Sequence, residues 1–225
     1  MVRRPPGGEE MNLQSAASLP GPGRLEAFSD GVLAIVITLL VLELKPPHLV
    51  APDDAREAMT ALVALGPKFL SYLLSFFFVA VFWVNHHRFF RLIQQVDTRL
   101  LWLNTLLLLA LSFVPFPTSM IGEYPGNAAV LALFALVLMI AGLAFNLMWR
   151  HARSRRLYHA GVDPAVVARA AARGLVGPAL YALAAVLAFV WPPAAWALFG
   201  IIPLFYALQR PGGVAQSRIS QKEKS

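Results

Sequence analysis

Residues able to exchange hydrogen bonds and charge stand at the start of an apolar segment, residues 24–44. Arg24, Ser29 and Asp30 fall in the first two turns of a helix over this segment, and no charge follows until Glu43. A carboxylate inside a membrane span is costly unless it faces protein or water and has partners. Asp30 therefore requires hydrogen-bond donors from neighbouring helices.

A second polar group closes the next apolar segment, and its residues are Trp83, Asn85, His86 and His87. Because the chain turns back between the two segments, we expect these side chains at the depth of Asp30. Such a layer is either a gating or proton-sensing network or a latch that holds helices in register. The two roles are compatible, since histidine titrates near neutral pH.

The chemistry of metal sites and enzymes is not indicated by these residues. His86 and His87 are adjacent, so on a helix they point about 100° apart and do not readily bind one metal ion together. The sequence has no HExxH, GxSxG, Walker or GxGxxG motif and no paired acid and base. We therefore expect no enzyme, no cofactor and no resident metal.

Composition identifies the class of protein that must position these groups. Of the 225 residues, 58% are hydrophobic and only 14% are charged, whereas soluble domains are about one quarter charged. This indicates an all-α protein that crosses a lipid bilayer several times. The net charge of +7 reflects where the basic residues lie along the chain and does not indicate nucleic-acid binding.

Six apolar segments are expected to span the membrane, although the last two are short. They cover about 25–44, 67–89, 99–119, 127–149, 173–190 and 194–208. Residues 45–66 form a loop in which Asp53 or Asp54 is placed to cap a short helix. We expect one six-helix transmembrane domain at 23–209, flanked by disordered cytoplasmic tails at 1–22 and 210–225.

Basic residues alternate between the links, which predicts the orientation. All but three of the 19 lysines and arginines lie in the two tails and in the links after spans two and four. The exceptions are Lys45, Arg56 and Lys68. Because cytoplasmic loops are enriched in basic residues, both termini are expected in the cytoplasm.

The first span has two dissimilar faces when it is drawn as a helix. Ile35, Leu39 and Leu42 share an aliphatic stripe, whereas Asp30 lies roughly 140° away from Ile35. The polar face must contact the protein itself. From periodicity alone, the stripe is expected to face lipid or the core.

Arg24, Phe28, Ser29 and Asp30 form the motif RxxxFSD, which is followed by GVLAIVITLLVLEL. This stretch closely resembles the first helix of the transmembrane protein 175 family. WVNHHRFF at 83–90 is similar to the end of the second helix of that family. These proteins are potassium channels, and the prokaryotic subunit has six helices. The resemblance implies a homotetramer in the cell membrane whose pore is lined by the first helix.

The resemblance also assigns roles to individual residues. It implies a hydrophobic constriction at Ile35, with Leu39 and Leu42 on the same stripe, and a moderate potassium preference supported by the Thr38 hydroxyl. There is no TVGYG filter in the sequence. Potassium is then the only metal ion expected, as the permeant ion. Arg24, Phe28, Ser29 and Asp30 are implied to tie the first helix to its neighbours.

Two other classes of function remain open from the residues themselves. A proton-coupled transporter would use Asp30 and a histidine of the second helix, and a scaffold or regulator would carry no flux. For Thr38, the alternative to a pore role is a hydrogen bond from its hydroxyl to the carbonyl of Ala34.

Overall fold

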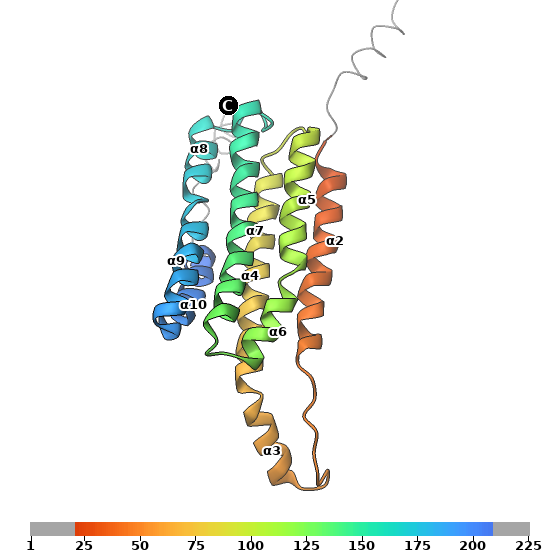
Figure 1. Cartoon of the computed structure of the whole chain (residues 1–225). Coiled ribbons are helices and arrows are strands. Elements are labelled where there is room, and N and C mark those ends of the chain that lie inside the picture. Colours follow the sequence, from red (N-terminus) through yellow and green to blue (C-terminus); the bar gives the residue numbers. More distant parts are fainter. Residues whose placement is uncertain (1–20, 209–225) are drawn as a thin grey trace, which may run out of the picture.

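A computed structural model describes residues 21–208 of the chain, and this part is helical, with one isolated antiparallel bridge between Ile93 and Tyr158 (Figure 1). The elements are α2 (Gly23–Leu39), the 3₁₀ turn η1 (Leu40–Glu43), α3 (Ala55–Ala64), α4 (Gly66–Phe90), α5 (Thr98–Ser112), α6 (Pro115–Glu123), α7 (Ala128–Arg155), α8 (Pro164–Arg173), α9 (Val176–Val190) and α10 (Pro192–Leu208). The all-α prediction is confirmed over these residues. The predicted tails lie almost entirely outside them.

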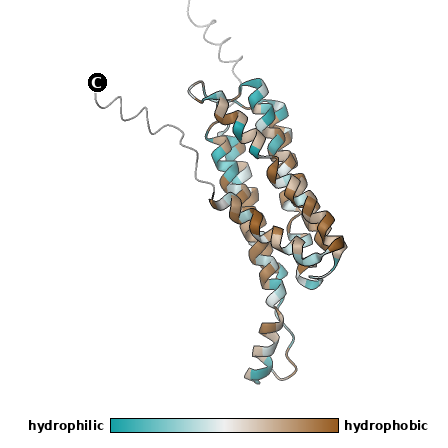
Figure 2. Cartoon of the chain, turned by 90° about the vertical axis from the view of Figure 1, so that its left-hand side faces the viewer, coloured by the Kyte–Doolittle hydropathy of each residue, from teal (hydrophilic) through white to brown (hydrophobic). Residues whose placement is uncertain are grey.

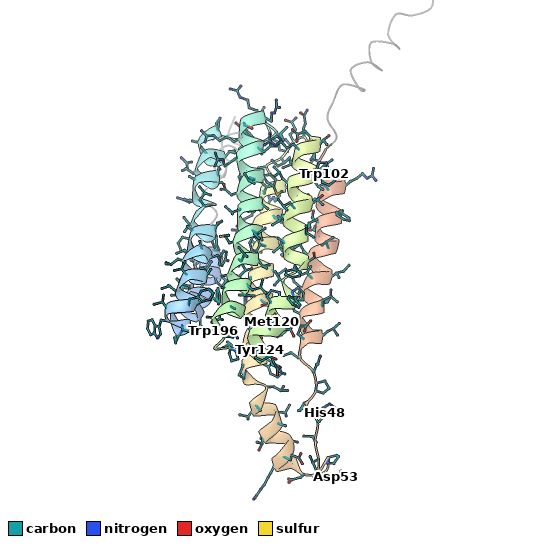
Figure 3. All side chains as sticks on the ribbon, viewed as in Figure 1. His48, Asp53, Trp102, Met120, Tyr124 and Trp196 are labelled. Carbon is teal, nitrogen blue, oxygen red and sulfur yellow. The ribbon has the colours of Figure 1, made fainter. Side chains whose placement is uncertain are left out.

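Five helical segments are long and apolar enough to cross a bilayer, and hydrophobic residues make up much of the bundle (Figure 2). They are Gly23–Glu43, Gly66–Phe90, Thr98–Glu123, Ala128–Arg155 and Pro164–Val190. The segment predicted as a sixth span forms a shorter apolar helix, Pro192–Tyr206, and the helix continues through Pro203. Trp102 lies at one end of the bundle, and Tyr124 and Trp196 lie at the other (Figure 3), as aromatic side chains do at membrane interfaces.

Two predicted spans are each built from two helices. The third breaks at Phe113 and Val114, because a helix is readily restarted by Pro115, whose missing N–H is not needed in a first turn. The fifth begins earlier than predicted, since α8 precedes α9 and is capped by Asp163. In the loop after η1, Asp54 accepts a hydrogen bond from the Arg56 N–H and caps α3. Asp54 is one of the two residues that the sequence offered for this cap.

Helix α7 forms the centre of the bundle, packed against α5, α6, α8 and α9. The ring of Phe134 on α7 meets the rings of Phe78 on α4 and Phe199 on α10 at centroid distances of 5.8 and 5.1 Å. At Gly142 a Cβ atom would lie 2.9 Å from the Pro178 ring, so glycine permits the close approach of α7 and α9. This arrangement supplies a rigid support for the outer helices.

Helix α2 lies on one flank of the bundle, opposite α8, α9 and α10 (Figure 1). It packs on α4 and α5, and η1 contacts α4 and α6. Within the described chain, nothing covers the other side of α2, so one face is buried and one is exposed.

Candidate functional site

The two faces of α2 differ sharply in exposure. Leu33, Val36 and Leu40 are at most 2% exposed, and they pack into the core. The opposite face carries four large hydrophobic side chains with much higher exposure: Phe28 at 61%, Ile35 at 59%, Leu39 at 41% and Leu42 at 67%. A regular row of exposed apolar side chains marks an interaction surface or a pathway. The predicted stripe therefore lies on the uncovered side of the helix.

Asp30 on α2 contacts the second helix of the polar layer. The Trp83 indole N–H on α4 donates a hydrogen bond of 3.0 Å to Asp30 Oδ1. Asp30 is half-buried, so this donor offsets part of the cost of removing the carboxylate from water. Helix α2 packs directly on α4, and this packing brings the two side chains into contact.

A fully buried chain of hydrogen bonds joins α2, α5 and α4 beside this contact. The Ser29 hydroxyl donates to the Leu25 carbonyl at 2.8 Å, so its oxygen is free to accept from Asn104 Nδ2 at 2.9 Å. Asn104 Oδ1 then faces His86 Nε2 at 2.9 Å, and because an amide oxygen only accepts, His86 Nε2 carries the hydrogen. His86 Nδ1 is buried with no partner among the described residues. Three helices are thereby held in one register.

His87 makes a separate contact to the start of α2. Its Nδ1 lies 3.1 Å from Glu26 Oε1, and its ring stacks on Trp83 with centroids 6.3 Å apart. Glu26 and Asn104 were not among the predicted site residues. Glu26 stands one helical turn before Asp30, on the same side of α2, and this spacing is the signal that would have identified it.

Three residues assigned to this network do not join it in the single subunit. Phe28 is exposed on the aliphatic stripe, and Asn85 donates to the Val81 carbonyl of its own helix at 2.9 Å. Arg24 is exposed and makes no ion pair with a described residue. The network consists instead of Glu26, Ser29 and Asp30 on α2 with residues from α4 and α5.

Thr38 lies on the exposed face of α2, next to Ile35 in the helix. Its hydroxyl donates to the Ile35 carbonyl at 2.9 Å, and not to that of Ala34. A hydroxyl has one donor and two acceptor positions, so the bond leaves both lone pairs of the Thr38 oxygen available. Those lone pairs are on the side of the helix that the bundle leaves uncovered.

Another polar contact joins the start of α5 to the last turns of α7. Asp97 caps α5 by accepting from the Leu100 N–H at 2.8 Å, and His151 Nε2 lies 2.8 and 3.0 Å from its two oxygens. Burial opposes ionisation of Asp97, but the Leu100 and His151 hydrogen bonds and the charge of Arg155 outweigh it and lower the pKa of this carboxyl. The contact fixes the α4–α5 link on α7.

In the described residues, no three histidine or acidic side chains gather where a metal ion would be held. The polar groups instead form hydrogen bonds between helices, and the uncovered surface is aliphatic. Such an uncovered aliphatic surface is typical of a pathway or of an interface with another subunit.

Comparison with known proteins identifies the family. Residues 24–115 match the family described as endosomal/lysosomal potassium channel TMEM175. A potassium channel of Streptomyces collinus is 37% identical over 193 residues, which cover 84% of this chain and 92% of the relative. The crystal structure of a lysosomal potassium-selective channel TMEM175 homologue from Chamaesiphon minutus superposes with a TM-score of 0.73 at 35% identity. It covers 83% of this chain and 96% of that one.

A more distant relative is the endosomal/lysosomal proton channel TMEM175 of Gallus gallus. It is 27% identical over 215 residues, and the match covers 91% of this chain but 42% of the chicken protein. The bacterial matches extend over nearly the full length of those relatives. The family match at residues 24–115 includes the polar layer and the stripe of α2. The chain therefore belongs to the TMEM175 family of multi-pass membrane channels.

Proposed function

We propose that this chain is a subunit of a channel that conducts potassium across the cell membrane. The observation that carries the proposal is the exposed aliphatic stripe of α2, a helix whose other face is packed and hydrogen-bonded. An ion pathway requires such a wall, and an enzyme does not. The bacterial relatives are named as potassium channels, which supports potassium as the permeant ion of this chain.

The pore in this proposal is lined by α2 from four subunits of a homotetramer. Ile35 lies one turn before the C-terminal end of α2 and is 59% exposed in the single subunit. A ring of four isoleucines is narrow and apolar, so it loses water readily and stops ions until it widens. Leu39, at the end of α2, and Leu42, in η1, continue the wall beyond Ile35.

Thr38 is proposed to supply selectivity. Its oxygen retains two lone pairs beside the Ile35 ring, and four such oxygens at one level replace part of the hydration shell of a potassium ion. A single hydroxyl layer provides fewer ligands than a filter of stacked carbonyl rings. The potassium preference over sodium is accordingly moderate.

The proposed topology has six spans, counting α10, with both termini in the cytoplasm and the channel domain at 23–209. The ends of α4 and α7 and the start of α5 carry arginines and lie together at one end of the bundle (Figure 1). The excess of basic residues at this end supports its placement on the cytoplasmic side. Helix α3 then projects on the opposite side.

Recording from purified protein in a planar bilayer tests this function. With potassium on one side of the bilayer and sodium on the other, a selective channel gives unitary currents whose reversal potential is shifted well away from zero, towards the potassium equilibrium potential. Absence of current from protein that elutes as a tetramer would reject the proposal. Current that reverses at zero would retain the pore and reject the selectivity.

A proton-coupled transporter is the second candidate, supported by the Glu26–His87 and Asp30–Trp83 contacts in one layer and by the name of the chicken relative. This mechanism gives saturable uptake that follows the proton gradient and no unitary current. Liposome flux measured with and without a pH difference therefore separates the two candidates.

A further inference from the structure

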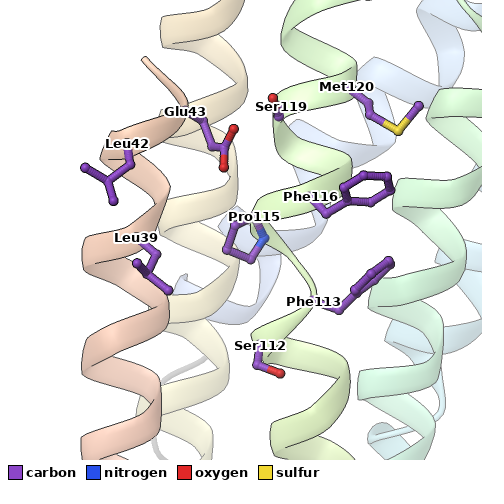
Figure 4. A pocket seen from close by; sticks show the side chains of 9 residues that line it. All are labelled: Leu39, Leu42, Glu43, Ser112, Phe113, Pro115, Phe116, Ser119 and Met120. Atoms are coloured by element: carbon purple, nitrogen blue, oxygen red, sulfur yellow. The ribbon is translucent and has the colours of Figure 1, made fainter. Parts of the chain in front are cut away.

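A pocket of about 390 Å³ lies between the end of α2 and the break that separates α5 from α6 (Figure 4). Leu39 and Glu43 form one side of it, and Phe113, Phe116 and Ser119 belong to the other. Its size falls within the range of about 300–1,000 Å³ typical of small-molecule sites. In the proposed topology this is the outer end of the channel.

Glu43 is the only charged residue in this lining. It is half-buried and makes no hydrogen bond or ion pair with another described residue. In Figure 4 its carboxylate points from η1 towards α6, into the space between the two elements. A partly desolvated carboxylate without a partner attracts a cation.

The remaining lining is suited to an apolar body more than to a hydrated metal ion. Phe113 and Phe116 are 47% and 52% exposed, and their rings lie 5.2 Å apart at a tilt of 36°. Aromatic faces attract organic ammonium groups. The Ser119 hydroxyl is half-buried and makes no hydrogen bond within the described chain, which adds one polar partner.

We propose that this pocket binds an amphipathic organic cation, with its ammonium group at Glu43 and its apolar substituents against Phe113, Phe116 and Leu39. The binding site stands beside the aliphatic stripe, since Leu39 belongs to both. Occupation would obstruct ions at the outer opening. Binding itself is independent of conduction, and only this effect on current rests on the proposed channel function.

Calorimetric titration of the full-length protein in lipid nanodiscs tests the site, with tetrapentylammonium as the probe. We expect Glu43→Gln to weaken binding at least about tenfold, because a charge-assisted contact is lost. Asp53→Asn is the matched control, because Asp53 is exposed in the loop before α3, has the same charge and is absent from the pocket. It should leave the affinity unchanged. Tetramethylammonium, which lacks an apolar body, should bind wild-type protein at least about tenfold more weakly.

Equal affinity of wild type and Glu43→Gln would overturn the proposal, as would an equal loss in Asp53→Asn, which would indicate general attraction of cations to the outer surface. A second measurement uses wild-type protein alone and does not depend on how a variant folds. A photoreactive quaternary ammonium should label the peptide containing residues 112–120, and labelling confined to other segments would contradict the site.

The outcomes for the site and for the channel are distinct. Protein that conducts potassium but binds tetrapentylammonium equally with and without the Glu43 charge retains the channel function and loses this site. Protein that binds the probe through Glu43 yet passes no current retains the site and loses the channel function.

Discussion

The indole N–H of Trp83 on α4 donates a 3.0 Å hydrogen bond to the carboxylate of Asp30 on α2, across 53 positions of sequence. This contact joins the helix with the exposed stripe to the packed bundle. Beside it, Asn104 links Ser29 to His86 in the buried part of the same layer. The position of the stripe relative to the bundle is therefore set by polar groups near the middle of α2.

Trp83→Phe removes the indole donor and keeps an aromatic ring. We expect a loss of about 1 kcal/mol in the free energy of unfolding, the usual contribution of one hydrogen bond to a partly buried acceptor. Thermal unfolding in detergent measures it. Trp102→Phe is the control, because Trp102 is 69% exposed and its indole makes no hydrogen bond with a described residue. Equal losses in the two variants would show that the bond to Asp30 contributes nothing.

Asp97→Asn tests the contact with His151. Because the pKa of Asp97 is lowered in the folded protein, its charge stabilises the fold fully above the ordinary pKa of 3.8. That contribution is lost as the pH falls through the lower folded value. Asparagine retains the helix cap, so the variant should lose about 1 kcal/mol at pH 6, and this loss should become smaller as the pH falls below 3.8.

Denaturation of the variant at pH 6 and at pH 3 provides the measurement. Asp163→Asn is the control, because Asp163 also caps a helix but has no histidine partner among the described residues. If Asp97→Asn lost the same stability at pH 6 and pH 3, the role of the charge would be rejected.

Arg156 ends α7 in the left-handed region, with φ of 53° and ψ of 42°. A side chain in this conformation costs about 1 kcal/mol, and glycine avoids that cost. Arg156→Gly should therefore raise the free energy of unfolding by up to about 1 kcal/mol. Arg153→Gly, one turn earlier inside α7, should lower it by about 0.5–1 kcal/mol. Chemical denaturation compares them, and destabilisation by both would contradict the argument.

The depth of each polar residue was predictable from the sequence, but its partner was not. Span limits and the basic residues place Asp30 and Trp83 in one layer, and in the structure the two side chains are hydrogen-bonded. The sequence does not specify helix rotation or side-chain rotamers. Asn85 accordingly bonds within α4, and the Thr38 hydroxyl selects the Ile35 carbonyl over that of Ala34.

The break between α5 and α6 was also not predicted. Pro115 and Pro117 are visible in the sequence, but proline is tolerated in a first helical turn as well as at a helix end. Hydropathy averages over such a break, because both halves are apolar. Residues on both sides of this break line the pocket beside Glu43, so its shape was not predictable from the sequence.

Ile35→Asn tests the proposed constriction. A polar ring holds water, so we expect a several-fold increase in open probability or unitary current, whereas Ile35→Phe should reduce current. Bilayer recording measures both. Ile201→Asn on α10 is the control, because Ile201 is exposed to a similar degree, 57%, but lies on the opposite flank. Unchanged current in both Ile35 variants would place the constriction elsewhere.

Thr38→Val keeps the volume of the side chain and removes the hydroxyl that donates to the Ile35 carbonyl. If four Thr38 oxygens replace part of the hydration shell of potassium, the reversal potential under opposed potassium and sodium should move towards zero. Thr105→Val is the matched control, because the exposed Thr105 hydroxyl on α5 donates to the Leu101 carbonyl at the same 2.9 Å. It removes an equivalent bond away from α2 and should leave the reversal potential unchanged. A conducting Thr38→Val channel with wild-type selectivity would reject the role of Thr38 and leave the pore along α2 intact.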